Sequence, residues 1–222
     1  MRPPHASSRQ RPLPFHSLLA LLLALWLAAC AKAPALAPLP PGAVVLAFGD
    51  SVTFGTGAAP GADYPTQLGA LTGWDVRNHG VPGDTAQAAR ARIEAAIEET
   101  RPALVIVEIG GNDFLKKRPE AAVRDDIRAI LDVARARKIP AVLVAVPKFS
   151  LFGTVAGRLE DSPIYAALAD EARLPLVANV FAEVLSDPSL KADPIHPNAP
   201  GYRRLAEGIA EQLRHSGLLA RH

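Results

Sequence analysis

The stretch "AVVLAFGDS", residues 43–51, joins an apolar run directly to a glycine, a carboxylate and a serine. Residues 43–48 have the length and the apolar character of a buried strand, and the run stops abruptly at Gly49. The continuation to "AVVLAFGDSVTFGTG", residues 43–57, leaves two interpretations of Ser51 open. It is either a turn residue or a nucleophile, and the segments that follow the other apolar runs have to decide between them.

Strand-like and helix-like segments alternate along the chain after this run. The predicted strands are residues 43–48, 74–80, 103–110, 140–147 and 174–179, and the predicted helices are residues 63–71, 84–100, 119–138, 163–172 and 198–217. Asp84 is the expected N-cap of the second helix. Five short apolar runs separated by helices predict an α/β fold of three layers, α/β/α, with a mostly parallel five-stranded sheet between helices on both faces.

Binding and catalytic groups of such sheets gather at the carboxyl ends of the strands. The segments that follow the predicted strands are Gly49 to Ser51, Gly80 to Asp84, Gly110 to Asp113 and the chain from Pro147 onward, with Asp193 to His196 before the closing helix. We therefore expect these segments to meet at one edge of the sheet.

A serine hydroxyl needs a base to become a nucleophile. Four of the six histidines lie near the ends of the chain (His5, His16, His215 and His222), and His79 ends a strand, where a structural role is the simpler interpretation. His196 lies between Pro194 and Pro197, which restrict its loop, and Asp193 precedes it by three residues, close enough to bind the ring Nδ1. Taken alone, this pair also fits a capping aspartate and a surface histidine.

Acyl transfer also needs hydrogen-bond donors for the negative charge that develops on the carbonyl oxygen. The candidates are the backbone N–H of Ser51, the backbone N–H of Gly83 in "NHGVPGDT" and the side-chain amide of Asn112 in "IGGNDF". Gly80 lies three residues before Gly83, and a shifted loop would present either glycine. Each of these segments is also an ordinary turn sequence.

Taken together and in this order, "FGDS", "NHGVPGDT", "GGND" and "DPIHPNAPGY" resemble the four sequence blocks of the SGNH, or GDSL-type, hydrolases. The resemblance covers residues 43–216 and is strongest to the bacterial multifunctional thioesterase/arylesterase/lysophospholipase branch. It implies the flavodoxin-like SGNH hydrolase fold. It also implies Ser51 as nucleophile, His196 as base, Asp193 as the residue that orients the base, and Gly83 and Asn112 beside Ser51 in the oxyanion hole. It implies no cofactor and no metal.

The resemblance implies a serine esterase that hydrolyses carboxylic esters and thioesters, such as aryl or short-to-medium acyl esters and lysophospholipids. Two alternatives stay open: an O-acetyl esterase acting on cell-envelope saccharides, and a catalytically inactive, lipid-anchored binding module. Phe149, Leu151 and Phe152 lie in an apolar segment after a strand end, where they either hold an acyl chain or pack beneath their own loop. We expect a small-molecule ester or lipid as the substrate and a monomeric protein.

Other classes of protein fit less well. No G-x-S-x-G elbow of an α/β-hydrolase occurs, and "GTGAAPG" is neither a dinucleotide-binding fingerprint nor a P-loop. The chain has 24 basic and 22 acidic residues and a formal charge of +2, which gives no reason to expect a nucleic-acid partner.

The N-terminal sequence predicts export. Residues 1–16 contain three arginines and no acidic residue, and residues 17–29 are apolar but short for a transmembrane helix. The run ends in "LAAC", which resembles a bacterial lipobox, and Cys30 is the single cysteine of the chain. We therefore expect a signal peptide over residues 1–30, lipidation at Cys30, an Ala/Pro-rich linker over residues 31–42 and anchoring of the hydrolase domain, residues 43–216, to a membrane of the bacterial envelope. The alternative is an ordinary signal peptide with a chance cysteine.

Overall fold

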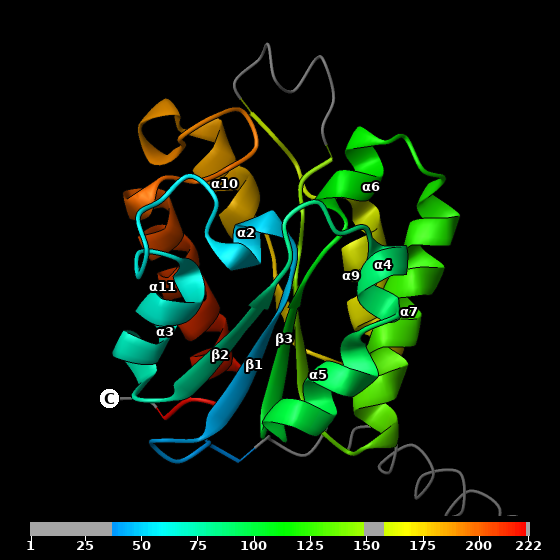
Figure 1. Ribbon diagram of the computed structural model, residues 1–222, viewed down its shortest axis with the longest axis vertical. Helices are drawn as coiled ribbons and strands as arrows, with labels where there is room; N and C mark the ends of the chain where they lie inside the picture. Colours follow the sequence, from blue (N-terminus) through cyan, green and yellow to red (C-terminus); the bar gives the residue numbers. More distant parts are fainter. Residues whose placement is uncertain (1–36, 149–157, 221–222) are drawn as a thin grey trace, which may run out of the picture. The chain divides into compact units, whose positions relative to one another are not determined.

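Five parallel strands form the centre of the fold, in the order β2-β1-β3-β4-β5 (Figure 1). The computed structural model describes residues 37–148 and 158–220, so the predictions made for Cys30, Phe149, Leu151 and Phe152 lie outside the described residues. The strands are β1 (Val44–Gly49), β2 (Asp75–Gly80), β3 (Leu104–Glu108), β4 (Ala141–Val144) and β5 (Leu176–Val177). Gly49 pairs with Gly80 on one side and with Glu108 on the other, so the carboxyl ends of β1, β2 and β3 lie side by side.

Helices cover both faces of the sheet, and Figure 1 shows the two groups on its left and right. The first group is α2 (Ser51–Phe54), α3 (Tyr64–Thr72), α10 (Val180–Ser186) and α11 (Ala199–His215), and a 3-10 turn, η1 (Pro188–Leu190), connects the last two. The second group is α4 (Ala86–Arg90), α5 (Ile93–Thr100), α7 (Glu120–Ala136) and α9 (Pro163–Ala172), with α6 (Gly111–Leu115) at the strand ends. This arrangement confirms the predicted three-layer α/β fold with a five-stranded parallel sheet.

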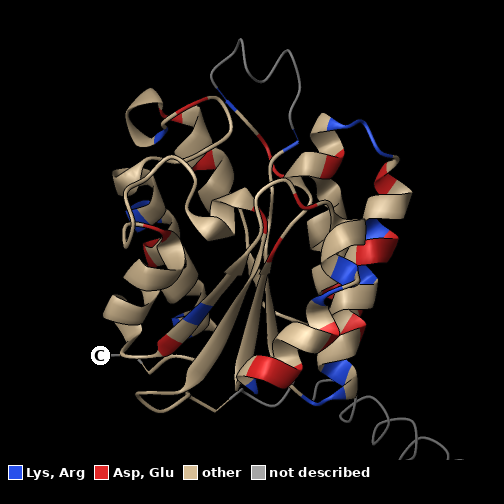
Figure 2. Cartoon of the chain, viewed as in Figure 1, with Lys and Arg blue, Asp and Glu red and all other residues tan. Residues whose placement is uncertain are grey.

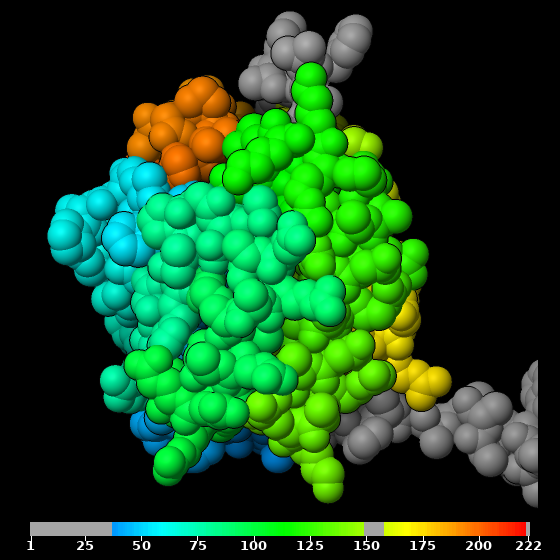
Figure 3. All heavy atoms as spheres, turned by 45° about the vertical axis from the view of Figure 1, so that its right-hand side comes forward, coloured from blue at the N-terminus to red at the C-terminus, as the bar shows by residue number. Residues whose placement is uncertain are grey.

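The sheet is apolar where helices cover it, except for the buried Glu108 at the end of β3. All residues of β3 are buried, as are those of β1 after Val44, which matches the continuous apolar runs in the sequence. The edge strand β2 carries the charged pair Asp75 and Arg77, whereas Figure 2 shows most other charged residues on the helices and loops. In Figure 3 the second helix group comes forward, and its atoms make up much of the face in view.

The predicted helix over residues 84–100 is wrong in two respects. The structure has two helices there, α4 and α5, and Arg92 lies at the break between them, with φ −116° and ψ −6°. Asp84 is not the N-cap: Thr85 caps α4 by accepting the N–H of Ala88 at 3.3 Å, while the Asp84 carboxylate pairs with Arg92. The sequence shows an unbroken helical periodicity because both helices pack apolar residues on the same side, and the break itself depends on contacts with distant loops.

Residues outside 43–216 also take part in packing. The N–H of Leu39 donates to the carbonyl oxygen of Leu218 at 2.9 Å, and Leu218 and Leu219 are buried. Among residues 37–148 and 158–220, no helix has both the length and the apolar character needed to cross a membrane.

Candidate active site

Ser51 is the first residue of α2 and follows β1 directly after Gly49 and Asp50. The Asp50 carboxylate accepts the N–H of Val52 at 3.0 Å and so caps this short helix. Gly49 has no space for a side chain, because a Cβ there would lie 2.1 Å from the carbonyl oxygen of Glu108. The abrupt stop in the sequence therefore packs the end of β1 closely against β3 and presents Ser51 at the edge of the sheet.

The structure brings Ser51, His196 and Asp193 together in one chain of contacts. The Oγ of Ser51 lies 3.0 Å from Nε2 of His196, a residue 145 positions away, and Nδ1 of the same ring lies 2.8 Å from Oδ2 of Asp193. The side chain of His196 is 13% exposed and that of Asp193 is 44% exposed, so the chain of contacts runs from the protein interior toward solvent. These are the three residues that the sequence blocks single out as nucleophile, base and orienting acid.

The loop that carries His196 is tied at both of its ends. Its base is closed by a hydrogen bond of 2.9 Å from the N–H of Ala192 to the carbonyl oxygen of His196. After the loop, the side chain of Asn198 caps α11 by accepting the N–H of Gly201 at 3.0 Å. The two prolines of the sequence are therefore part of a loop that is also fixed by hydrogen bonds.

Asp193 is held in its ionised form. Burial alone would raise the pKa of Asp193, but hydrogen bonds from the His196 side chain and from the backbone N–H of Ile195 outweigh it, so that its pKa lies below the ordinary value. A carboxylate at this position can accept a hydrogen bond from Nδ1, and Nε2 of the same ring faces Ser51.

Asn112 lies in α6, beyond the end of β3. Its Nδ2 donates to the carbonyl oxygen of Asp84 at 2.9 Å and to Oδ2 of Asp50 at 3.2 Å. The turn before Asn112 is also fixed, because the hydroxyl of the buried Tyr165 donates to the carbonyl oxygen of Ile109 at 2.7 Å. Asn112 thus connects the segment after β1 with the segment after β2.

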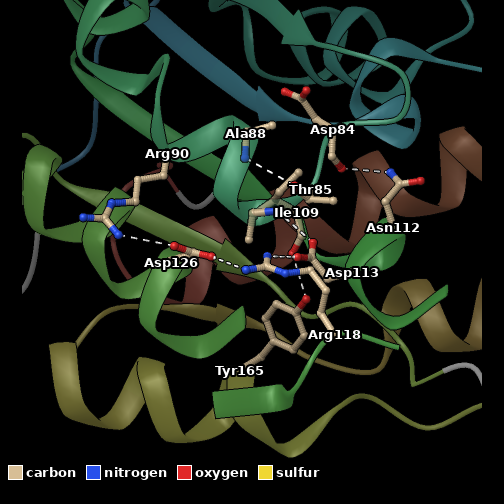
Figure 4. A network of polar contacts seen from close by, with 11 residues as sticks. Asp84, Thr85, Ala88, Arg90, Ile109, Asn112, Asp113, Arg118, Asp126 and Tyr165 are labelled. Atoms are coloured by element: carbon tan, nitrogen blue, oxygen red, sulfur yellow. Dashed lines mark hydrogen bonds and ion pairs between the residues drawn. The ribbon is translucent and has the colours of Figure 1, made fainter. Parts of the chain in front are cut away.

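A polar network continues from Asp113 away from the site (Figure 4). The buried carboxylate of Asp113 accepts the N–H of Ala86 at 2.8 Å, at the start of α4. Arg118 binds Asp113 and also Oδ2 of Asp126, the latter at 2.9 Å. Neighbouring residues of α6 therefore hold the segment 84–86 at two points, one through Asn112 and one through Asp113.

The two glycines that the sequence left open differ in their surroundings. The N–H of Gly80 already donates to Oδ1 of Asn78 at 2.9 Å, and a Cβ at Gly80 would lie 2.1 Å from the backbone nitrogen of Phe54. Gly83 has a φ of +86°, and a Cβ there would meet no atom within 4 Å among the described residues. Gly80 is thus a packing residue, and Gly83 lies in an open turn between Val81 and Asp84.

Two carboxyl groups lie beneath Ser51. Burial raises the pKa of Asp50 to about 7, although the N–H of Val52, the charge of His196 and the amide of Asn112 each lower it. Burial, together with the neighbouring Asp50, raises the pKa of Glu108 well above its ordinary value. The hydroxyl of Thr53 donates to Oε2 of Glu108 at 2.9 Å, whereas Oε1 has no partner among the described residues.

A pocket opens beside Ser51 and has mixed walls. Its polar wall includes Ser51, Asn112 and His196, and its apolar wall is Val52, Leu115, Val146, Phe181 and Ile195. Sequence reasoning missed this apolar wall, because its members come from five segments and only the fold brings them together. The described residues contain no group of three or more His, Cys, Asp or Glu side chains arranged to hold a metal ion.

Comparison with known proteins gives one consistent result. Residues 47–204 match the GDSL-like lipase/acylhydrolase family. The chain is 30% identical over 177 residues to thioesterase 1/protease 1/lysophospholipase L1 of Escherichia coli K12, covering 77% of this chain and 83% of that protein. It is 29% identical over 178 residues to esterase TesA of Pseudomonas aeruginosa, covering 77% and 87%.

Solved structures agree with this assignment. A crystal structure of TesA superposes with a TM-score of 0.68 at 27% identity, covering 78% of this chain and 99% of that one. AlinE4, an SGNH-hydrolase family esterase, superposes with a TM-score of 0.61 at 29% identity, covering 80% and 98%. The chain therefore has the SGNH-hydrolase fold and belongs to the GDSL-like lipase/acylhydrolase family.

Proposed function

We propose that this protein is a serine esterase that hydrolyses carboxylic esters and thioesters through an acyl-enzyme on Ser51. The observation that supports this most strongly is the unbroken series of contacts from Oγ of Ser51 to the His196 ring, 3.0 Å, and on to Asp193, 2.8 Å. The relatives named above are described as esterase, thioesterase and lysophospholipase, and the same chemistry is proposed here for this chain.

In the first half-reaction, Oγ of Ser51 bonds to the carbonyl carbon while Nε2 of His196 takes the serine proton. The electron pair of the C=O bond moves to oxygen and gives a tetrahedral oxyanion. When the oxyanion collapses, the bond to the leaving group breaks and the alkoxide or thiolate takes the proton from His196. In the second half-reaction, water attacks the acyl-enzyme, His196 takes a proton from that water, and Ser51 is released with the proton returned to it.

The oxyanion is stabilised by the N–H of Ser51, the N–H of Gly83 and the side-chain amide of Asn112. Ser51 begins α2, so its N–H is one of the free donors of a helix start. Gly83 is favoured over Gly80 because the N–H of Gly80 is already bonded to Asn78. The fold holds these donors in place, so that they replace water around the charge with little reorganisation during the reaction.

The walls of the pocket support an acyl or aryl substituent as the substrate group. Leu115, Val146, Phe181 and Ile195 offer apolar contact directly beside Ser51. Exposed apolar side chains follow the ends of β1, β2 and β3, with Phe54 55%, Val81 40% and Leu115 45% exposed. Phe149, Leu151 and Phe152 are proposed to add to this surface.

A substrate panel tests the proposal. The panel contains p-nitrophenyl esters of increasing chain length, an acyl-CoA, a lysophospholipid and an acetylated saccharide, each assayed with wild type, Ser51→Ala and His196→Ala. We expect turnover of the acyl esters by wild type and its loss in both variants. Activity confined to the acetylated saccharide would favour the O-acetyl esterase, and no activity on any substrate would favour the inactive binding module.

The location of the enzyme is proposed from the sequence alone. We propose that residues 1–30 are a signal peptide, that Cys30 is lipidated, and that residues 31–42 link the hydrolase domain, residues 43–216, to a membrane of the bacterial envelope. Two acyl chains or more would give a stable anchor, since each buried methylene contributes about 0.8 kcal/mol. Expression in the presence of a labelled fatty acid tests this: label on wild type but not on Cys30→Ser supports the anchor, and equal label on both contradicts it.

A further inference from the structure

The guanidinium group of Arg92 binds three separate segments at the carboxyl edge of the sheet. Its Nη2 donates to the carbonyl oxygen of Gly49 at 2.7 Å, and its Nη1 donates to the carbonyl oxygen of His79 at 2.9 Å. Its Nε donates to Oδ2 of Asp84 at 2.7 Å. The group also lies over the ring of Phe48, 4.1 Å from the ring centre, so its plane is fixed as well as its donors.

Two of these three contacts, to Gly49 and to Asp84, lead to the proposed oxyanion donors, and the third is to His79 in β2. Gly49 is two residues before Ser51, and Asp84 directly follows Gly83. The backbone oxygen of the same Asp84 accepts the amide of Asn112 at 2.9 Å, which Figure 4 shows. A single side chain from the break between α4 and α5 therefore contacts the supports of all three donors.

We propose that Arg92 is a positioning residue that holds the oxyanion hole in its working geometry. The proposal rests on the proposed serine esterase function. Arg92 does not line the pocket beside Ser51, so it acts through the groups it binds and not on the substrate. Neither the sequence blocks nor the family match identifies this residue.

Two physical effects make Arg92 difficult to replace. The first is geometric: guanidinium carries five N–H groups in a rigid fork and reaches three acceptors at once, whereas an ammonium group is a single point of charge. The second is electrostatic. The carboxylate of Asp84, only 14% exposed, lies one residue from Gly83, and without its cation it would oppose the negative charge of the oxyanion.

The test compares Arg92→Met and Arg92→Lys with Arg128→Met as the matched control. Arg128 also binds carboxylates on two segments, Glu171 and Asp125, and its side chain is 32% exposed against 24% for Arg92, but its partners lie in α7 and α9. All variants are assayed with a p-nitrophenyl ester well below their unfolding temperature.

We expect Arg92→Met to lower kcat on the order of 10- to 100-fold, as small displacements of catalytic groups do. The KM should change by less than about threefold, because the pocket walls are intact. The kcat of Arg92→Lys should lie between those of Arg92→Met and wild type, and the kcat of Arg128→Met should match that of wild type. Added guanidinium should restore part of the activity that Arg92→Ala has lost. It should restore none of the activity that Ser51→Ala has lost. Unchanged kcat in Arg92→Met, or an equal loss in Arg128→Met, would overturn the proposal.

A second measurement does not depend on activity. Amide hydrogen exchange should speed up over residues 80–86 in Arg92→Met and remain at the wild-type rate there in Arg128→Met, since Arg92 binds Asp84 in this segment and Arg128 binds Asp125 and Glu171. Full esterase activity in Ser51→Ala would defeat the proposed function, and the exchange comparison would still decide whether Arg92 holds the loop. Equal exchange in the two variants would overturn the positioning role.

Discussion

The carboxyl group of Asp50 accepts a hydrogen bond from the side-chain amide of Asn112 at 3.2 Å, at a position where Asp50 is only 2% exposed. The same Nδ2 donates its other hydrogen to the carbonyl oxygen of Asp84 at 2.9 Å. Both hydrogens of the amide are thus engaged before any substrate binds. The bond to Asp84 fixes the amide, and under the proposed mechanism the oxyanion would replace Asp50 as the acceptor of the second hydrogen.

This relationship leads to a prediction for Asn112. Asn112→Ala should lower kcat by about 10²–10³, the usual cost of losing one oxyanion donor. Asn112→Asp should be at least as severe, since it replaces the donor with a negative charge beside Asp50. Steady-state kinetics with a p-nitrophenyl ester measure both, and a kcat within a few fold of wild type for Asn112→Ala would rule out its role as a donor.

The raised pKa of Asp50 also predicts that the stability of the protein depends on pH. Its pKa is about 7 in the folded protein, chiefly because of burial, against an ordinary value of 3.8. Below pH 3.8 it is neutral in both the folded and the unfolded state; as the pH rises toward 7, the unfolded chain ionises first and is stabilised relative to the folded state. Stability is therefore lost as the pH rises through this range, and the loss is complete above the folded pKa.

Asp50→Asn removes this contribution. Between pH 5 and pH 8 the free energy of unfolding of wild type should fall relative to that of Asp50→Asn by about 2–3 kcal/mol, at 1.4 kcal/mol per pKa unit. Urea unfolding at pH 5, 6, 7 and 8 measures the difference. Glu108 remains in both proteins, but the neighbouring Asp50 helps to raise its pKa, so Asp50→Asn lowers that pKa and adds to the difference in slope in the same direction. Parallel stability curves for the two proteins would contradict this account.

We expect opposite consequences for substitution by alanine at Gly80, the last residue of β2, and at Gly83 in the turn that follows. In Gly80→Ala the Cβ would lie 2.1 Å from the nitrogen of Phe54, so we expect a large loss of stability and little folded protein. In Gly83→Ala the Cβ has open space, but the φ of +86° is unfavourable for alanine, so the protein should fold with a modest loss of stability and a reduced kcat. Thermal unfolding and kinetics together test this, and the reverse order of stability would show that the two roles are exchanged.

The sequence predicted the fold through the apolar runs and their order, because buried parallel strands require continuous apolar segments. The contact between Ser51 and His196 was predicted from the resemblance to the SGNH hydrolases, because only Ser51 follows a strand end, whereas His196 lies between η1 and α11. The position of Asp193 three residues before His196 predicted their contact locally.

The remaining features could not be predicted, because they depend on contacts between segments distant in the sequence. The break at Arg92 lies within an unbroken helical periodicity, and the hydrogen bonds that Arg92 makes there to Gly49, His79 and Asp84 become clear only from the folded chain. Phe181 in the pocket wall comes from α10, a helix that the sequence analysis did not assign. Asp50 had no evident role in the sequence, and its partners Val52 and Asn112 become clear only from the folded chain.

Covalent labelling of Ser51 tests the central claim most directly. Wild type and Ser51→Ala are treated with a fluorophosphonate, digested and mapped by mass spectrometry, with Ser189→Ala as a control serine outside the site. The account predicts one phosphonyl adduct, on Ser51, in wild type and in Ser189→Ala, and no adduct in Ser51→Ala. An adduct on a different serine, or equal labelling of wild type and Ser51→Ala, would contradict it.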